Sequence, residues 1–281
     1  MRIEALNVHP VKSTAIRSVL RADVGPAGLR GDRTWMVVDE AAAMVSAREL
    51  PELFRVVSDT SSTDPALRSA LRLRAPGMPD LELDEPAGPD VEVTMFARPP
   101  MRAREAGAEA GEWLSCATGR RGLRLVWCDD PTRRRLNPMF AADADHTAFA
   151  DGYPVTLATT ESLSRLNDQV TGTALERGEE PSPPLPMARF RPNIVISGSP
   201  APYAEDDWTR VAIGAVAFRV VKDVDRCVMT TIDPDTLSRG HEPIRTLARH
   251  RRWEGKTWFC RHLVPDGVGT VAVGDELRVL G

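Results

Sequence analysis

The chain has 281 residues, of which 42% are hydrophobic and 27% charged, and its formal net charge at pH 7 is −4. This length supports one large domain or two of ordinary size, and the composition is that of a folded globular protein rather than a coiled coil or a low-complexity chain. A slightly acidic chain has no overall attraction to phosphate backbones or anionic lipid, so we expect neither nucleic acid nor a membrane as its main partner.

Short strands separated by turns are predicted for the first hundred residues. Residues 3–7, 19–24 and 34–38 carry strand signals, and the last segment is apolar enough for a buried strand. Over residues 70–94, alternating leucines and turn residues predict two or three antiparallel strands.

The middle of the chain contains two predicted helices and a predicted boundary. Apolar spacing over residues 106–117 predicts a helix that ends at Gly119 and packs on the sheet. Residues 129–153 then lose periodicity, which marks a domain boundary or a loop. A strand over residues 154–158 is expected to lead into a helix over 160–167, with Thr159 or Thr160 as the N-cap.

The last third again favours strands. A proline-rich loop over residues 174–188 precedes an apolar strand at 194–196. Residues 211–221 predict a hairpin that turns at Ile213-Gly214, and residues 271–280 predict another that turns at Gly274-Asp275. Because strands predominate and helices are short, the pattern predicts a mainly β fold with short helices (α+β), a β-barrel with helical decoration rather than a wound α/β sheet.

The cysteines do not indicate a metal centre built by the chain alone. Cys116, Cys128, Cys227 and Cys260 are scattered and form no Cys-x-x-Cys pair, so they lack the spacing of a structural zinc or iron–sulfur site. No export signal opens the chain, and no apolar run is long enough to span a bilayer. We therefore expect a cytoplasmic protein with reduced thiols.

One cysteine nevertheless lies in a promising segment, since the apolar hairpin runs directly into Arg226 and Cys227. This order predicts a thiol at the end of a strand, beside a guanidinium that favours the thiolate. A thiolate there can be a nucleophile or a soft metal ligand. The alternative is a cysteine that only packs in the core, followed by Thr230, Thr231 and Asp233 as caps and turns.

A second group of motifs combines cations with hydroxyl and amide groups. Lys12-Ser13 follows Pro10-Val11, and Gly31-Asp32-Arg33, Ser46-Ala47-Arg48 and Arg191-Pro192-Asn193 come later in the chain. At strand ends and turns, these residue types fit a phosphate or another polyanion. Routine surface charges are the alternative, and residues 191–193 can also be a structural clamp on the proline-rich loop.

Five motifs in this order resemble the MOSC family, which is named after the C-terminal domain of molybdenum cofactor sulfurase. The branch that the chain resembles most is that of the mitochondrial amidoxime reducing component and its bacterial relatives. The motifs are Pro10-Val11-Lys12-Ser13, Gly31-Asp32-Arg33-Thr34-Trp35, Phe190-Arg191-Pro192-Asn193-Ile194, Tyr203-Ala204-Glu205-Asp206-Asp207-Trp208, and the run from Arg226-Cys227 to Asp235.

The resemblance implies two domains with a cofactor between them. An N-terminal MOSC β-barrel domain is expected over residues 1–120, a connecting loop region over 121–153, and a MOSC domain over 154–281, with the N-terminal β-barrel region packed on the MOSC β-barrel domain. The implied cofactor is molybdenum-molybdopterin, with Cys227 as the metal ligand and catalytic residue. The positions implied to bind the pterin and its phosphate, or to lie near them, are Lys12, Ser13, Arg33, Arg48, Thr159, Arg191, Asn193 and Arg226.

The activity implied by the resemblance is that of a molybdenum-dependent oxidoreductase. Its expected substrates are small N-hydroxylated compounds such as amidoximes and hydroxylamines, which are reduced to amidines or amines. The chain lacks the cysteines of an attached ferredoxin-type domain, so we expect electrons from a separate donor protein of ferredoxin or cytochrome type.

Two departures from the family pattern support a competing hypothesis. Asp223 and Asp225 stand where relatives carry small or uncharged residues, and a carboxylate there disfavours an anionic cofactor unless it points away or pairs with Arg226. Residues 259–262 replace a Phe-Gly-x-Asn pattern and predict a bulkier, more basic wall. These changes favour a cofactor carrier or sulfur-handling protein without turnover. A third hypothesis is a purely structural β-barrel with a core cysteine.

Overall fold

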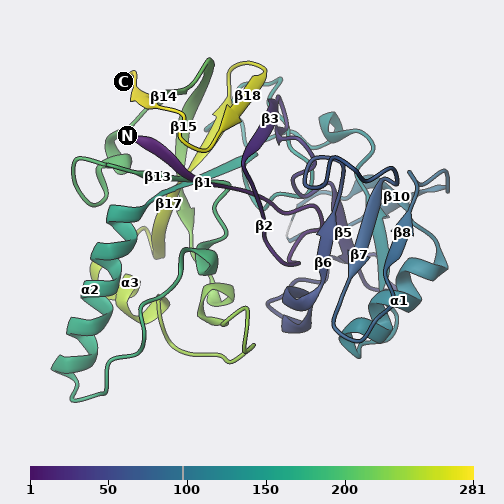
Figure 1. The fold of residues 1–281 in the computed structure, drawn as a ribbon, viewed down its shortest axis with the longest axis horizontal. Coiled ribbons are helices and arrows are strands. Elements are labelled where there is room, and N and C mark those ends of the chain that lie inside the picture. Colours follow the sequence, from purple (N-terminus) through teal and green to yellow (C-terminus); the bar gives the residue numbers. More distant parts are fainter. Residues whose placement is uncertain (97) are drawn as a thin grey trace. The chain divides into compact units, whose positions relative to one another are not determined.

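The computed structural model describes residues 1–96 and 98–281, and this part of the chain is mainly β (Figure 1). The helices α1 (Ala108–Thr118), α2 (Thr160–Glu176) and α3 (Ile244–His250) have 11, 17 and 7 residues. The expected mainly β fold with short helices is therefore confirmed. None of the described helices combines the length and apolar character that a membrane span requires.

The chain forms two compact units that do not follow simple chain order. Unit 1 contains residues 1–7, 20–24 and 155–281, and unit 2 contains residues 8–19 and 25–154. The break after Pro154 comes directly behind the aperiodic stretch 129–153, where a boundary is expected. Two N-terminal strands nevertheless belong to the same unit as the C-terminal half, because their main-chain partners lie there. The family-based division at residues 120 and 153 stays a prediction.

Unit 1 is built around one large sheet with the strand order β19-β14-β15-β17-β12-β13-β1, and β16 pairs with β17. Neighbouring strands are antiparallel, except that β12 and β13 are parallel. A separate antiparallel pair joins β3 to β18. The strands of this unit are β1 (Arg2–Val8), β3 (Arg21–Gly25), β12 (Val155–Thr159), β13 (Ile194–Ser197), β14 (Arg210–Ile213), β15 (Val216–Asp225), β16 (Arg252–Trp253), β17 (Lys256–Pro265), β18 (Gly269–Ala272) and β19 (Leu277–Val279).

The two ends of this strand path approach each other. Ile3 donates its main-chain N–H to Asp275 O at 2.9 Å, and Leu277 donates to Met1 O at 3.0 Å. These bonds and one isolated bridge join β1 to the residues around the start of β19, but within the described chain no continuous strand pair closes the sheet. The barrel form of the expected fold therefore stays a prediction.

One of the two predicted hairpins is confirmed and the other is wrong. Strands β14 and β15 pair directly across the turn at Ile213-Gly214, as expected. The segments on either side of Gly274-Asp275 are both strands, but β18 pairs with β3 and β19 pairs with β14. The turn itself exists, because the Asp275 carboxylate accepts the Ala272 N–H at 2.8 Å. Turn residues specify a change of direction, whereas partner choice depends on strands far away in the sequence.

Helix α2 begins where expected and continues well beyond the expected end. Thr159 is the N-cap and its side chain accepts the Ser162 N–H. The sequence predicts an end near residue 167, but Leu166, Val170 and Ala174 continue one buried face to Glu176. Polar residues and Gly172 between them hide this periodicity in the sequence. Figure 1 shows α2 beside α3, and an ion pair between Glu176 and Arg249 joins the two helices.

Unit 2 contains two smaller sheets. One has the strand order β5-β11-β10-β9 and the other β6-β7-β8. The strand predicted at residues 34–38 is confirmed as β5, and all its side chains are buried. The strands of this unit are β2 (Arg17–Val19), β4 (Gly28–Leu29), β5 (Trp35–Val38), β6 (Val57–Asp59), β7 (Leu71–Arg74), β8 (Leu81–Leu83), β9 (Asp90–Val93), β10 (Met101–Glu105) and β11 (Arg124–Trp127).

The helix predicted over residues 106–117 is confirmed as α1, within two residues at each end. Trp113 and Leu114 are buried on its inner face, and the Trp113 indole N–H donates to Pro79 O at 2.7 Å. Gly119 ends the helix with a left-handed φ of 75°, a conformation that glycine adopts without steric cost. Gly111 instead allows α1 to approach the neighbouring main chain closely, since a Cβ at this position would lie 2.3 Å from Leu123 O.

Candidate functional site

The residues expected at the cofactor fall into both units. Lys12, Ser13, Arg33 and Arg48 belong to unit 2, and the other five belong to unit 1. The five in unit 1 are Thr159, Arg191, Asn193, Arg226 and Cys227.

Lys12 is a buried cation in a turn that follows β1. Its N–H bonds to Trp35 O at 2.8 Å, and only 4% of the residue is exposed. The ammonium donates to Phe149 O at 2.8 Å and forms an ion pair with Asp151. Burial lowers the pKa of Lys12 to about 8, although Asp151 opposes this shift. Its burial and its specific charge partner make Lys12 a candidate binding residue.

This lowered pKa predicts a pH-dependent stability term. Between pH 8 and 10.5 the unfolded chain holds a proton on Lys12 that the folded chain has largely lost, so the contribution of Lys12 to the free energy of unfolding rises with pH in this window. Compared with Lys12→Met, which lacks the group, the wild type should gain about 2–3 kcal/mol between pH 7 and pH 10. Denaturant unfolding of both proteins at the two pH values measures this difference, and a constant difference would contradict it.

Three of the expected cofactor residues have left-handed backbone conformations. Ser13, Arg33 and Arg191 have φ angles of 71°, 50° and 50°. Only a few per cent of non-glycine residues adopt positive φ, and such conformations concentrate at functional sites, where surrounding contacts hold them. In unit 2, hydrogen bonds from Arg33 N to His9 O at 2.7 Å and from Phe149 N to Arg33 O at 2.9 Å fix the Arg33 backbone. The sequence motifs identified these three residues from their side-chain types alone, and their positive φ angles are a separate observation from the structure.

Positive charge is in excess around Lys12. The Lys12 ammonium and the Arg48 guanidinium lie 5.6 and 5.5 Å from the centre of the Phe96 ring. Lys12, Arg33 and Arg48 together outweigh the desolvation of Asp151 and hold the pKa of that carboxyl below its usual range. Arg33 is also paired with the buried Asp32, so the three cations Lys12, Arg33 and Arg48 stand beside two carboxylates, and the remaining positive charge suits an anionic group such as a phosphate.

Thr159 is fully buried between a strand and a helix in unit 1. Its hydroxyl donates to the Glu205 carboxyl at 3.1 Å and accepts the Ser162 N–H at 3.2 Å. Burial raises the pKa of Glu205, although hydroxyl hydrogen bonds oppose the shift. The structure therefore gives Thr159 a capping role, and its contact with a cofactor stays a prediction.

Asn193 connects three strands of unit 1. Its Oδ1 accepts the Thr156 N–H at 3.1 Å and its Nδ2 donates to Asn7 O at 3.1 Å. The residue is fully buried, so its side-chain amide holds β1 and β12 against β13. This is the structural clamp that the sequence left open as an alternative, although it joins strands rather than the proline-rich loop.

Cys227 lies two residues after the end of β15, as expected, and its thiol is free and half-buried. It is the N-cap residue of a single 3-10 turn over Val228–Thr231. Thr230 donates its hydroxyl to Cys227 O at 2.9 Å, and Thr231 donates to Val228 O at 2.7 Å. The threonine hydroxyls thus cap carbonyl groups of the turn that begins at Cys227.

Arg226 is held beside the segment that carries Arg191. Its Nε donates to Phe259 O at 2.7 Å and its Nη1 to Phe190 O at 3.1 Å. The Arg226 guanidinium also hydrogen-bonds the buried Cys260 thiol. Arg191, which follows Phe190 directly, is 7% exposed. The contact of Arg226 with Phe190 O therefore brings the segment of Arg191 close to Arg226 and Cys227 in unit 1.

The two unexpected carboxylates both have basic partners, but not Arg226. Asp223 forms an ion pair with Arg261, and the Asp225 carboxylate lies 3.1 Å from the Lys256 ammonium. Of the two conditions that the sequence left open, pairing with Arg226 is not the one found, because strand register places Asp223 opposite Arg261. The same pair neutralises the guanidinium that suggested a more basic wall.

Cys260 has a left-handed φ of 75° inside β17, opposite a register shift in β15. A side chain in this conformation costs about 1–3 kcal/mol. We expect Cys260→Gly to be more stable than Cys260→Ala by about 1 kcal/mol, since both remove the thiol but only glycine relieves the strain. In a strand without such strain, glycine gives a lower free energy of unfolding than alanine. Denaturant unfolding of the two variants therefore distinguishes the two cases by which variant is more stable.

Potential metal ligands are sparse in this protein. Across residues 1–96 and 98–281, no group of three or more His, Cys, Asp or Glu side chains could hold a metal ion. A metal at Cys227 would therefore need further ligands from a cofactor.

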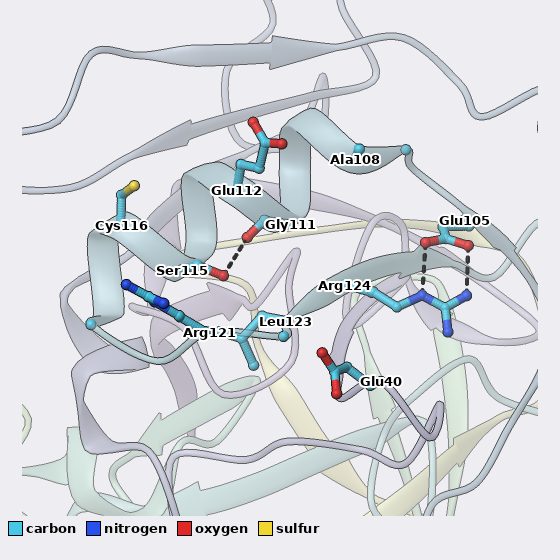
Figure 2. Close-up of a pocket in the computed structure, with 13 residues that line it drawn as sticks. Glu40, Glu105, Ala108, Gly111, Glu112, Ser115, Cys116, Arg121, Leu123 and Arg124 are labelled. Carbon is cyan, nitrogen blue, oxygen red and sulfur yellow. Dashed lines mark hydrogen bonds and ion pairs between the residues drawn. The ribbon is translucent and has the colours of Figure 1, made fainter.

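Figure 2 shows a cavity of about 720 Å³ beside α1 in unit 2. Glu112 and Cys116 line it from the helix, Arg121 lines it from the following loop, and the ion pair between Arg124 and Glu105 lies at one side. None of the residues expected at a cofactor lines this cavity.

Sequence reasoning missed Asp151 and Arg189. Asp151 pairs with Lys12 across 139 positions of sequence, and the only signal was its place in an Asp- and Ala-rich run. Arg189 donates to Thr230 O at 3.3 Å and to the Asp233 carboxylate at 2.9 Å, so it fixes the turn that follows Cys227. Its position at the end of the proline-rich loop, two residues before Arg191, was a signal that could have indicated this.

Two family models match the chain, one described as the MOSC domain over residues 144–278 and one as the MOSC N-terminal beta barrel domain over residues 1–121. Among solved structures, the YuaD protein of Bacillus subtilis aligns with 98% of this chain and 93% of its own at 14% identity. Its TM-score of 0.37 is too low for a fold assignment.

Curated relatives match along almost the whole chain. Mitochondrial amidoxime-reducing component 1 of Mus musculus is 32% identical, and the match covers 99% of this chain and 82% of that protein. The same component of Homo sapiens is 31% identical over 99% and 83% of the two chains. Mitochondrial amidoxime reducing component 2 of Rattus norvegicus is 30% identical over 96% and 80%. The chain therefore belongs to the MOSC family, with the N-terminal beta barrel domain and the MOSC domain in that order.

Proposed function

We propose that this protein is a molybdenum-cofactor-dependent reductase of small N-hydroxylated compounds. The observation that carries the proposal is the half-buried Cys227 thiol at the end of β15, in a chain that matches amidoxime-reducing components over almost its full length. Amidoximes and hydroxylamines are the substrate classes, and a separate electron-transfer protein is the donor. The cytoplasmic location expected from the sequence stays a prediction.

The residues present fit such a cofactor in both units. In unit 1, Cys227 offers one sulfur ligand next to the Arg226 guanidinium. In unit 2, Ser46 Oγ is buried and lacks a partner among the described residues, two positions before the cation Arg48. Buried polar groups are almost always paired, so this unpaired hydroxyl suits a bound polar ligand.

The bound cofactor would supply two-electron redox chemistry at a metal. The chain would hold it through the Cys227 sulfur and through cations of Lys12, Arg33 and Arg191 for its anionic parts. The hydrogen bonds of Thr230 and Arg189 keep the thiol-bearing turn in one conformation. The overall reaction consumes the N-hydroxylated compound, two electrons and two protons, and yields the amine or amidine and water.

The test uses protein purified from a host that makes the cofactor. We expect molybdenum in the purified protein and, with a chemical reductant, conversion of an aromatic amidoxime to the amidine with two electrons consumed per product. Elemental analysis and chromatography measure these two quantities. Bound molybdenum without product from either an amidoxime or a hydroxylamine would indicate the carrier hypothesis instead.

The carrier hypothesis has lost much of its structural motivation. It depended on Asp223 and Asp225 and on the altered residues 259–262. Arg261 and Lys256 pair with the two carboxylates, which leaves the bulkier side chains of residues 259–262 as its remaining support. Reduction therefore remains the function that the site supports best.

A further inference from the structure

Three consecutive arginines in the stretch after β11 have three different environments in unit 2. Arg133 forms an ion pair with Asp129 at 2.6 Å, and Arg135 donates to Asp143 O at 2.8 Å in an exposed contact. Arg134, between them, is only 7% exposed. The sequence pattern places all three in a loop and gives the middle one no role.

The guanidinium of Arg134 binds the main chain of one short segment. Its Nη1 donates to Ala148 O and Ala150 O, and its Nη2 donates to Asp151 O at 3.1 Å. The planar fork of an arginine can reach several carbonyls at once, which a single ammonium cannot do with the same geometry. Three main-chain carbonyls of residues 148–151 are thus fixed around one buried cation.

Lys12 also contacts residues 148–151, at groups that Arg134 leaves free. The Lys12 ammonium donates to Phe149 O at 2.8 Å, and it pairs with the Asp151 carboxylate. The carbonyls of residues 148 and 150 therefore face Arg134, while the carbonyl between them faces Lys12. A change in the path of residues 148–151 would move both groups that hold the ammonium.

We propose that Arg134 is a positioning residue, which fixes residues 148–151 and through them the place of the Lys12 ammonium. Its relevance to catalysis rests on the proposed function, in which Lys12 binds an anionic part of the cofactor. The contacts themselves lie entirely within unit 2.

The electrostatic environment is consistent with this role. Burial lowers the pKa of Arg134 to about 10, with Arg98 acting in the same direction and Asp151 against it. The charged groups that act on Lys12 are Asp151, Arg33 and Arg134, of which both arginines lower its pKa. Removing Arg134 deletes one of these charges and frees three carbonyls to seek water, so Lys12 becomes better solvated.

The experiment measures the titration of Lys12 itself in the intact chain. The protein has only three lysines, Lys12, Lys222 and Lys256, so isotope labelling of lysine side chains gives an NMR spectrum with few signals, assigned with Lys12→Met. We expect the Lys12 midpoint near 8 in the wild type and a clear shift toward 10.5 in Arg134→Gln. Arg133→Gln and Arg135→Gln are the matched controls and should keep the wild-type midpoint.

A second variant covers the case in which Arg134→Gln does not fold. Arg134→Lys retains a cation but cannot span the three carbonyls, so its Lys12 midpoint should also rise, by less. An unchanged Lys12 midpoint in whichever of these variants folds overturns the proposal, as does an equal shift in Arg133→Gln.

A separate readout distinguishes this proposal from the proposed function. In protein made by a cofactor-producing host, the molybdenum content of Arg134→Gln should be lower than that of Arg133→Gln by about ten-fold or more. If the Lys12 midpoint shifts as expected while even the wild type holds no molybdenum, Arg134 positions Lys12 but the cofactor assignment is wrong.

Discussion

Replacement of Cys227 by serine is expected to reduce bound molybdenum at least about ten-fold and to abolish reduction of N-hydroxylated substrates. A serine hydroxyl is a harder and far less acidic ligand than a thiol, so it replaces the sulfur poorly at a metal with other sulfur ligands. The main-chain contacts of Cys227 with Thr230 do not involve its sulfur, and the 3-10 turn should persist. Elemental analysis of both proteins, purified in parallel from one cofactor-producing host, measures the effect.

Cys116→Ser is the matched control for this variant. Cys116 is also a free cysteine but is exposed on α1 in unit 2, and its replacement should leave molybdenum content and activity at the wild-type level. Equal molybdenum in wild type and Cys227→Ser would remove the assigned ligand. Thermal melts of both variants verify that a loss of metal does not reflect a loss of fold.

The largest stability effect is expected at Gly111, in the middle of α1. A Cβ at this position would lie 2.3 Å from Leu123 O, and a main-chain oxygen at the start of β11 cannot rotate away. Helix α1 must therefore shift from β11, which also disturbs buried Trp113 and Leu114. We expect Gly111→Ala to lower the free energy of unfolding by about 3 kcal/mol, as measured by denaturant unfolding.

Gly172→Ala, in helix α2, is expected to change the free energy of unfolding in the opposite direction. Gly172 lies within α2, where no neighbouring atom of the described chain comes within 4 Å of the place that an alanine Cβ would take. Alanine favours the helix over glycine by about 1 kcal/mol, so this variant should be more stable than the wild type. A similar effect from both substitutions would show that helix propensity, and not the approach of α1 to Leu123, decides the result.

Local patterns predicted the elements that depend on local chemistry. Strand β5, helix α1 and the hairpin of β14 and β15 follow from periodicity, a glycine cap and a short turn. Helix α3 was missed because seven residues contain too little periodicity to recognise. The strand β17 was missed because it is buried on both faces for much of its length and so does not alternate.

The site was predictable where one segment carries the signal. Cys227 follows an apolar strand, so its place at a strand end could be inferred from neighbours in sequence. The pairing of Lys12 with Asp151 could not, since loop closure over so many residues depends on the whole of unit 2. Asn193 shows a different difficulty, because an amide looks the same in the sequence whether it binds a ligand or joins strands.

The membership of β1 and β3 in unit 1 affects how this protein can be divided and how it is made. A fragment that starts at Val155 would leave β13 and β18 without their antiparallel neighbours, and such open edges promote association between molecules. On the ribosome, the first two dozen residues emerge long before the strands that complete them. Dissection at the obvious mid-chain break should thus give an aggregation-prone C-terminal half, and adding residues 1–24 as a separate peptide should restore its solubility.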